Sequence, residues 1–405
     1  MLADLHAHYP MHVLRDVGPR TTLERMLRVS GRSRLTDKAR ALLLKVLARL
    51  ISDRDWWSGP RISVPYLRAG GVGLVFSVLY RPFEEMDLAR AYTAPPASEY
   101  FAALLEDLDA VERDLAQQDP AVIRLVRDRA ELDRCLREGA TAVVHCVEGG
   151  FHLGDTTAEI AANVRTLAQR GVAYVTLAHL FFRQVAANAP ALPFLADPVY
   201  DVLFPQKPGA ALTERGEAAV RAMVEHGVIV DISHMRADAV AETLTLLDEL
   251  DPAGTVPVLS SHAGYRFGGQ DYMHDEATVR AIARRDGVVG LIFAQHQLND
   301  GVRKGETETL AESVEVIRRH VDEIARITGS HRHVALGSDF DGFIKPTLGG
   351  IEDMRAMADV ERELRRLYAQ DAAGICFDNA LRVLRAAWPS RVNPQAGRRP
   401  SGGRP

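Results

Sequence analysis

The stretch Leu-Ala-Asp-Leu-His-Ala-His, residues 2–8, decides how the rest of the chain is interpreted. It predicts a short buried strand that ends in His6 and His8. Side chains alternate between faces along a strand, so these two imidazoles point the same way. Two imidazoles on one face can hold one metal ion. The fold then depends on whether other strands bring ligands to the same place.

Seven further apolar runs of strand length follow, most of them preceded by Gly or Pro. They cover residues 73–80, 142–148, 173–179, 228–234, 257–262, 288–293 and 333–339. Helical patterns lie between most of them, for example at 158–170, 213–226, 277–285 and 310–327. Strand–helix alternation with eight strands predicts an α/β fold, a parallel (β/α)8 barrel of the TIM type with helical insertions.

We expect one barrel domain over residues 1–388, with helical insertions at about 10–70 and 84–140. The second insertion has a helical pattern at 98–115 and a short strand-like run at 122–126. The tail, residues 389–405, is rich in Pro, Gly and Arg and is expected to be disordered.

Composition narrows the class of protein. A net charge of -5 over 405 residues argues against a nucleic-acid partner. The three cysteines are far apart and form no disulfide framework, which favours a reducing cytoplasm. We expect no signal peptide and no membrane span, because no apolar run is long enough.

Six of the eight runs end in a residue that can bind a metal or move a proton. These residues are His6 with His8, Glu148, His179, His234, His262 and Asp339. Taken singly, such histidines are more often packed or capping residues, Asp339 could cap a helix and Glu148 could pair with a surface cation. In a barrel, however, all strand ends meet at one face. Their coincidence there favours a joint metal site.

Glu148 is the only glutamate among these strand ends, so it is the natural carboxylate to bridge two ions, which in such sites lie roughly 3.5–4 Å apart. A metal pair lowers the pKa of a bridging water and polarises a carbonyl group. Asp339 is then a candidate to accept the proton of the attacking water and pass it to the leaving amine. The pattern therefore predicts a metal-dependent hydrolase.

Several motifs together resemble the membrane (renal) dipeptidase family of the amidohydrolase superfamily. They are EGG at 148–150, GVAYVTLAH at 171–179, the run 212–234 ending in VDISH, PVLSSHAGYR at 257–266 and HVALGSDFDG at 333–342. FDNALRVLR, at 377–385, is similar to the C-terminal helix of that family. The motifs occur in the family's order, from residue 2 to about 388.

The resemblance implies a distorted barrel with two Zn²⁺ ions per chain, although another divalent metal could serve, and a dipeptide as substrate. His6 and His8 would bind the first zinc, Glu148 would bridge, and His234 and His262 would bind the second. By the same resemblance, His179 would bind the substrate carbonyl and stabilise the tetrahedral intermediate, and Asp339 would be the acid/base. A homodimer is the assembly that the resemblance suggests.

The chain departs from the family at two places. The family has His-x-Asp on the first strand, where this chain has His6 and His8. The family's arginine for the substrate carboxylate has no counterpart at residues 272–274, and Arg266 is nearer and could bind the substrate instead. An amide or lactam hydrolase for another small molecule therefore remains an alternative. A catalytically silent binding barrel is disfavoured, because every expected ligand position holds a competent residue.

Overall fold

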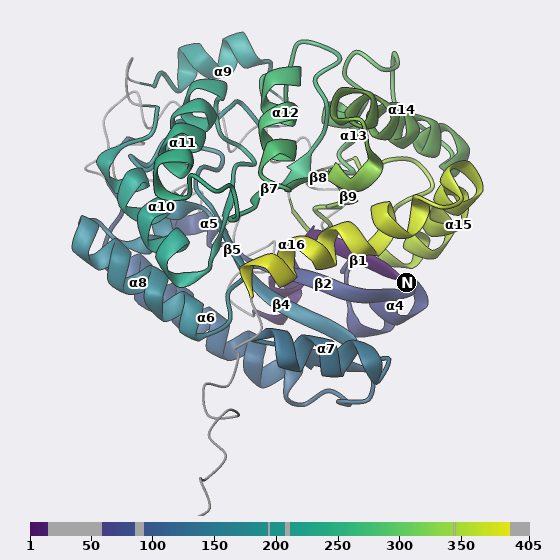
Figure 1. Ribbon diagram of the computed structural model, residues 1–405, viewed down its shortest axis with the longest axis horizontal. Coiled ribbons are helices and arrows are strands. Elements are labelled where there is room, and N and C mark those ends of the chain that lie inside the picture. The colour runs from purple at the N-terminus through teal and green to yellow at the C-terminus, as the bar shows by residue number, and fades with distance from the viewer. Residues whose placement is uncertain are drawn as a thin grey trace, which may run out of the picture.

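The computed structural model describes residues 1–14, 59–85, 93–192, 195–206, 211–342, 344 and 346–388. Strands lie at the centre of the molecule and helices surround them (Figure 1). The strands are β1 (Leu2–Ala7), β2 (Val72–Leu79), β3 (Ile123–Leu125), β4 (Thr141–Glu148), β5 (Tyr174–Thr176), β6 (Ile229–Asp231), β7 (Val258–Ala263), β8 (Val288–Leu291) and β9 (Val334–Leu336).

Eight of these strands form a nearly closed parallel barrel in the order β1-β2-β4-β5-β6-β7-β8-β9. The short strand β3 lies off this path and pairs with β4. The two ends of the sheet meet through backbone hydrogen bonds, because Asp339 N donates to His6 O (2.8 Å) and His8 N donates to Phe340 O (2.9 Å). The predicted (β/α)8 fold is confirmed, and each of the eight predicted strand runs overlaps one barrel strand.

The helices among the described residues are mostly crossovers between consecutive strands. They are α1 (Pro10–Val13), α4 (Val64–Ala69), α5 (Pro82–Glu85), α6 (Glu99–Leu115), α7 (Arg129–Arg137), α8 (Thr157–Gln169), α9 (Asp197–Leu203), α10 (Glu214–His226), α11 (Ala237–Leu250), α12 (Glu276–Arg284), α13 (Gln295–Leu298), α14 (Leu310–Thr328), α15 (Met357–Tyr368) and α16 (Asn379–Ala387). Short helical turns are η1 (Gly150–Leu153), η2 (His331–His333), η3 (Met354–Ala356) and η4 (Gly374–Asp378).

Local sequence explains where the long helices begin and end. Thr309 caps α14, with Glu312 returning the bond in a capping box, and Gly329 ends the helix in a left-handed conformation (φ 76°). Helix α10 is bounded in a similar way: Thr213 caps its start, and Gly227 ends it in a left-handed conformation (φ 71°). Each of these helices therefore stops just before its next strand, which fixes the strand–helix phase of the barrel.

Apolar side chains fill both the barrel and the layer between barrel and helices. Inside the barrel, Leu5, Phe76 and Tyr174 belong to a buried cluster that also contains Leu384 of α16. Asn379 of α16 donates through Nδ2 to the carbonyl of Val334, the first residue of β9 (2.7 Å). Helix α16 therefore closes the N-terminal end of the barrel, and it lies across the strands in Figure 1. The candidate site lies at the opposite end of the barrel, where the strands terminate.

The predicted insertions are only partly described. Helix α6, strand β3 and helix α7 lie within residues 84–140, as expected for the second insertion. Residues 15–58 of the first insertion and the tail 389–405 lie outside the described residues, so the predicted domain division stays a prediction. None of the described helices combines the length and the apolar character that crossing a lipid bilayer requires.

Candidate metal centre

The predicted site residues other than Arg266 come together at the C-terminal end of the barrel. His6, Glu148 and His262 lie within β1, β4 and β7, where backbone pairing on both sides fixes them. The others follow their strands by one to three residues, in the segments that leave the barrel: His8, His179, His234 and Asp339. All of these side chains are nearly inaccessible, the most exposed being Asp339 at 7%.

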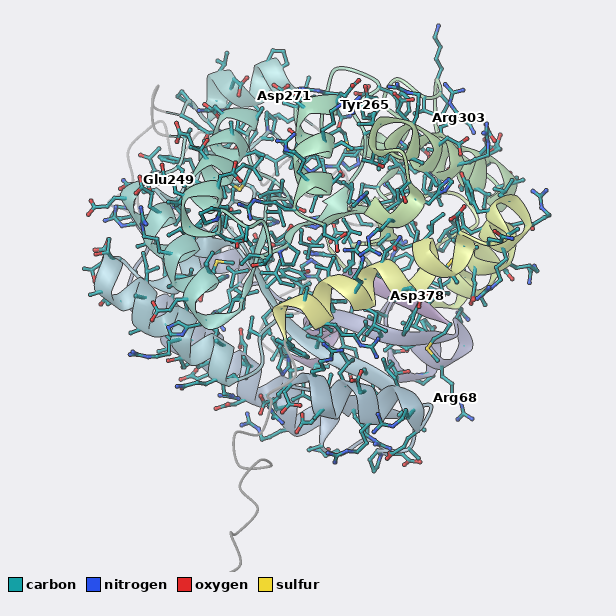
Figure 2. The ribbon with its side chains drawn as sticks, in the orientation of Figure 1. Arg68, Glu249, Tyr265, Asp271, Arg303 and Asp378 are labelled. Atoms are coloured by element: carbon teal, nitrogen blue, oxygen red, sulfur yellow. The ribbon has the colours of Figure 1, made fainter. Side chains whose placement is uncertain are left out.

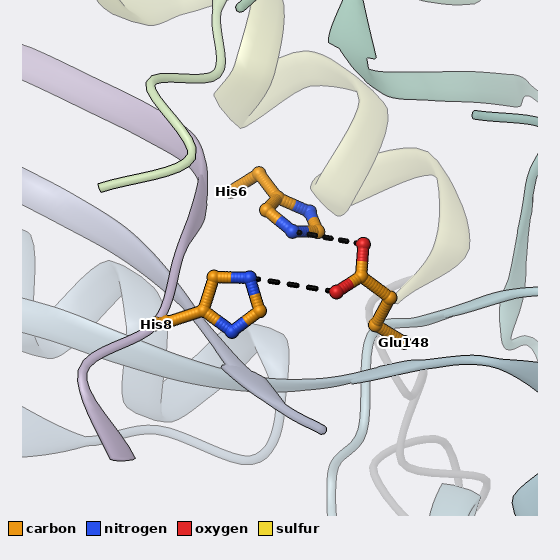
Figure 3. A group of neighbouring side chains, drawn as sticks. All are labelled: His6, His8 and Glu148. Atoms are coloured by element: carbon orange, nitrogen blue, oxygen red, sulfur yellow. Dashed lines mark ion pairs between the residues drawn. The ribbon is translucent and has the colours of Figure 1, made fainter. Parts of the chain in front are cut away.

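The Glu148 carboxylate lies at the centre of the cluster, as Figure 3 shows for its contacts with His6 and His8. Its Oε2 lies 3.4 Å from Nε2 of His8 and 3.4 Å from Nε2 of His179. Its Oε1 lies 3.3–3.5 Å from the Nε2 atoms of three further histidines, which are His6, His234 and His262. One carboxylate therefore faces five imidazole nitrogens that come from four strands or their ends, with His6 and His8 both from β1.

The donor set fits a metal pair. Nε2 of His6 and Oε1 of Glu148 are buried and have no hydrogen-bond partner among the described residues. Nε2 atoms of His234 and His262 lie only 2.9 Å apart. Imidazole nitrogen and carboxylate oxygen are preferred zinc ligands, and unpartnered buried polar atoms are costly unless something binds them. Two compact triplets share Glu148: one adds His6 and His8, and the other adds His234 and His262.

A third cluster of His6, Asp231 and His262 also has metal-like spacing. Both oxygens of Asp231 are already occupied, however. Oδ1 accepts from Ser233 N (3.1 Å), Ser233 Oγ (2.9 Å) and Ser261 N (2.9 Å), and Oδ2 accepts from Thr176 Oγ1 and Ser261 Oγ (2.6 Å each). A carboxylate with five donors has little capacity left for an ion. Asp231 therefore acts as a hydrogen-bond acceptor that positions neighbouring residues, and not as a metal ligand.

The electrostatics of the cluster keep Glu148 charged. Burial by itself would raise its pKa, but the His179 and His6 imidazoles hold the pKa of this carboxyl well below its ordinary value. Burial lowers the pKa of His262 well below its ordinary value, and nearby His6 and His234 lower it further. His262 is therefore a neutral ring, which is the protonation state that a metal ligand needs.

His179 differs from the other histidines because a second carboxylate holds it. Glu85 Oε2 lies 2.6 Å from Nδ1 of His179. Against the lowering effect of burial, Glu148 and Glu85 raise the pKa of His179 to about 9. Glu85 is fully buried and also accepts from Tyr80 OH (2.7 Å) and Phe181 N (2.9 Å). This pair makes His179 a cationic hydrogen-bond donor at neutral pH.

The sequence interpretation missed Glu85. It lies at the end of α5, at the start of the stretch that was interpreted as a helical insertion, and no periodic pattern marks it. The only local signal is an acidic residue soon after a barrel strand, which is common in surface turns. Its position depends on tertiary contacts of the segment after β5, since Phe181 supplies one of its donors.

Backbone conformation at two ligand-type residues is unusual. His234 (φ 64°) and Asp339 (φ 59°) both adopt the left-handed region, which costs about 1–3 kcal/mol for a residue with a side chain. Gly342 gives Asp339 its space, because a Cβ at Gly342 would lie 2.0 Å from Asp339 Oδ1. Asp339 Oδ1 in turn lies 3.1 Å from His8 Nε2 and 3.7 Å from His6 Nε2. The SDFDG turn thus directs this carboxylate at the first triplet.

Arg266 lies among acidic side chains. Its guanidinium pairs with Asp271 (2.7 Å) and Asp275 (3.3 Å). Figure 2 shows Asp271 at the edge of the molecule in that view. His274 is in the region where an arginine was sought, and its Nε2 is bonded to Ser260 Oγ (2.7 Å). The substrate-binding role of Arg266 stays a prediction.

Comparison with known proteins gives a consistent result. A family model described as membrane dipeptidase (peptidase family M19) matches residues 23–395. An uncharacterized protein in the pqqA 5′ region of Klebsiella pneumoniae is 27% identical over 290 residues, covering 69% of this chain and 94% of that protein. An uncharacterized dipeptidase of Schizosaccharomyces pombe is 26% identical over 324 residues, covering 78% and 71%.

Two solved structures share the fold. A metallo peptidase from Rhodobacter sphaeroides, liganded with a phosphinate mimic of the dipeptide L-Ala-D-Ala, has a TM-score of 0.68 at 18% identity and covers 96% of this chain and 99% of that one. A dipeptidase described as a metallo peptidase of family M19 has a TM-score of 0.67 at 17% identity, covering 96% and 98%. The family match begins after His6 and His8, so geometry alone ties this pair to the site.

Proposed function

The chain belongs to the membrane dipeptidase family, peptidase family M19, and we propose that it is a binuclear zinc dipeptidase whose centre is built around Glu148. The observation that supports this most is the convergence of five imidazole nitrogens on one buried carboxylate. His6 and His8 would hold one ion, His234 and His262 the other, and Glu148 both, which matches the two compact triplets.

Two bound divalent ions supply an acidified water and a polarised carbonyl group. The remaining chemistry belongs to the chain. Asp339, whose Oδ1 lies 3.1 Å from His8 Nε2, stands at the edge of the first triplet and accepts the proton of the attacking water. It then returns that proton to the leaving amine. His179, charged through Glu85, donates from Nε2 to the substrate carbonyl oxygen as negative charge develops there.

Metal analysis tests the first half of this proposal. Chain purified in metal-free buffer and reloaded with zinc should hold close to two ions, and Glu148→Gln should hold fewer. A properly folded chain that takes up no zinc would reject the proposal, because no other described group offers the same donor set. Manganese and cobalt reloading in parallel would show which divalent metal the site prefers.

A substrate panel tests the second half. L,L-, L,D- and glycyl dipeptides, including L-Ala-D-Ala, are compared with N-blocked and C-amidated versions of the same compounds. A dipeptidase should cleave the free dipeptides and lose most of its activity on the blocked ones. Equal cleavage of free and blocked substrates would reject a dipeptidase.

The second candidate is a metal-dependent amide or lactam hydrolase for another small molecule. One observation favours it: Arg266 is already paired with Asp271 and Asp275, and His274 is engaged with Ser260. A free α-carboxylate on the substrate would therefore need a cation from elsewhere in the chain. Cleavage of C-amidated substrates or of a lactam in the same panel would support this candidate. Cytoplasmic location and a homodimer stay predictions.

A further inference from the structure

One hydroxyl group, that of Ser261, contacts a ligand of each proposed ion. Ser261 Oγ lies 2.7 Å from Nδ1 of His262 and 3.0 Å from Nδ1 of His6. These are the ring nitrogens that face away from Glu148, since both Nε2 atoms face its carboxylate. His6 comes from β1 and His262 from β7, and all of these side chains are fully buried.

Asp231 fixes the direction of these hydrogen bonds. Its Oδ2 accepts from Ser261 Oγ at 2.6 Å, and a carboxylate oxygen accepts and does not donate. Ser261 has one hydroxyl hydrogen, which Asp231 occupies, so the Ser261 oxygen can only accept from an imidazole. The nitrogen that donates must be Nδ1–H. A neutral imidazole carries one N–H, so its Nε2 lone pair is left facing Glu148.

The two histidines depend on Ser261 to different degrees. Ser261 Oγ is the only hydrogen-bond partner of His262 Nδ1 among the described residues. His6 Nδ1 has a second partner, because Tyr174 OH lies 2.8 Å away. Tyr174 OH donates to the carbonyl of Leu5 (2.9 Å), so it shares the single Nδ1–H of His6 with Ser261 and favours the same tautomer.

The backbone around Ser261 is shaped for this position. Strand β7 has a register shift between Ser260 and Ala263, which breaks the regular alternation of side chains. The Ser261 carbonyl oxygen approaches β8 and the end of β9 so closely that a Cβ at Gly290 or Gly337 would lie 2.0 or 1.9 Å from it. Two glycines therefore give Ser261 the space that its position requires.

We propose that Asp231 and Ser261 are positioning residues that set the tautomer of one ligand for each ion, so that one shared hydroxyl supports both metal sites. This inference rests on the proposed function. It adds that a single hydroxyl outside the ligand set acts on both ions. Second partners of this kind typically change metal affinity by about 10–100-fold when removed.

The role of Ser261 can be tested by measuring the stepwise zinc affinities of the chain by competition with a chromophoric chelator. Ser261→Ala is compared with Ser260→Ala, which removes an equally buried hydroxyl from the adjacent residue. The Ser260 hydroxyl bonds to His274 and, at 3.4 Å, to Ser233, and to no proposed ligand. Ser261→Ala should weaken the site of His262 by about 10–100-fold and the other site by less. Tyr174→Phe should weaken only the site of His6. Affinities of Ser261→Ala within twofold of Ser260→Ala at both sites would overturn the proposal.

Asp231→Asn offers a sharper variant, because the amide has nearly the same shape but donates from Nδ2. The three donors at Oδ1 include two backbone N–H groups that cannot turn round, so the amide nitrogen should take the Oδ2 position. Ser261 would then accept from it and donate its own hydrogen to His262. We expect His262 to change to the Nε2–H tautomer and to bind zinc more weakly than in Ser261→Ala.

Histidine tautomers can be read in the metal-free protein from ¹⁵N chemical shifts of a ¹⁵N-histidine-labelled chain, assigned by single replacement. His262 should be Nδ1–H in the unaltered chain and Nε2–H in Asp231→Asn. An Nε2–H His262 in the unaltered chain would overturn the proposal even if Ser261→Ala and Asp231→Asn failed to fold. If the unaltered chain binds two zinc ions but Ser261→Ala matches Ser260→Ala, only this inference fails. If it binds none, the proposed function fails and this inference with it.

Discussion

The carboxylate of Glu85 lies 2.6 Å from Nδ1 of His179, while Nε2 of the same ring faces Glu148 at 3.4 Å. One imidazole thus joins two buried carboxylates. A histidine with a pKa raised to about 9 contributes stability that is complete below its unfolded pKa of about 6.5. That contribution is lost as pH rises through about 9.

Replacing Glu85→Gln should lower the pKa of His179, because the ring loses one of the two carboxylates that raise this pKa most. NMR titration of metal-free protein should show His179 losing its proton at lower pH than in the unaltered chain. Glu84→Gln is the matched control, since Glu84 is adjacent but pairs with Arg81 (2.6 Å). An unchanged titration of His179 in Glu85→Gln would contradict the pairing.

The same replacement should reduce kcat more than it changes KM, because the charge on His179 matters most as the carbonyl oxygen becomes negative. The loss should not exceed the roughly 10²–10³-fold that removal of an oxyanion donor costs. It should also be larger at pH 8 than at pH 6, where His179 can still hold its proton. A pure change in KM would show that Glu85 acts only on substrate binding.

Asp339→Asn should remove the proposed acid/base while keeping the shape of the side chain. General acid–base groups typically contribute about 10²–10⁴-fold to turnover, so kcat should fall by that amount. Metal content should stay near that of the unaltered chain, because the two compact ligand triplets do not include Asp339. Turnover near the original rate, with both ions bound, would exclude the proton-transfer role.

Gly342→Ala tests whether the turn after β9 positions Asp339. The new Cβ would lie 2.0 Å from Asp339 Oδ1, so the carboxylate must move. A shift of about 1 Å in a catalytic group can cost about 10²-fold in rate. Gly269→Ala is the control, because a Cβ there meets nothing within 4 Å. Equal kinetics for the two variants would show that Asp339 tolerates the movement.

Much of the barrel could be predicted from sequence, because its signals are local and repeat. Buried parallel strands give continuous apolar runs, and glycines such as Gly227 and Gly329 mark helix ends before the next strand. The convergence of His6, Glu148 and His262 followed from one rule, that parallel strands end at the same face of a barrel. Position along a strand was enough to bring them together.

The residues that position the site histidines, Ser261 and Glu85, could not be predicted in this way, because their roles depend on contacts between distant segments. Alternation along β7 places Ser261 on the face opposite to His262, but the register shift in that strand brings its hydroxyl to the ring of His262. Glu85 reaches His179 across 94 residues of sequence. Neither contact leaves a pattern of charge or hydrophobicity, so only the folded structure shows it.

Removing divalent ions should destabilise the folded chain, because the ions bind a site that the unfolded chain lacks. Each ion adds about 2.7 kcal/mol when its free concentration is 100 times its Kd. Chelation should therefore lower the thermal midpoint, and zinc should restore it in a concentration-dependent way. Glu148→Gln removes the negative charge shared by both ligand triplets, so its midpoint should respond much less to chelator or zinc. The control is an unaltered chain in which two bound ions have first been measured. If chelation leaves its thermal midpoint unchanged, metal binding adds no stability.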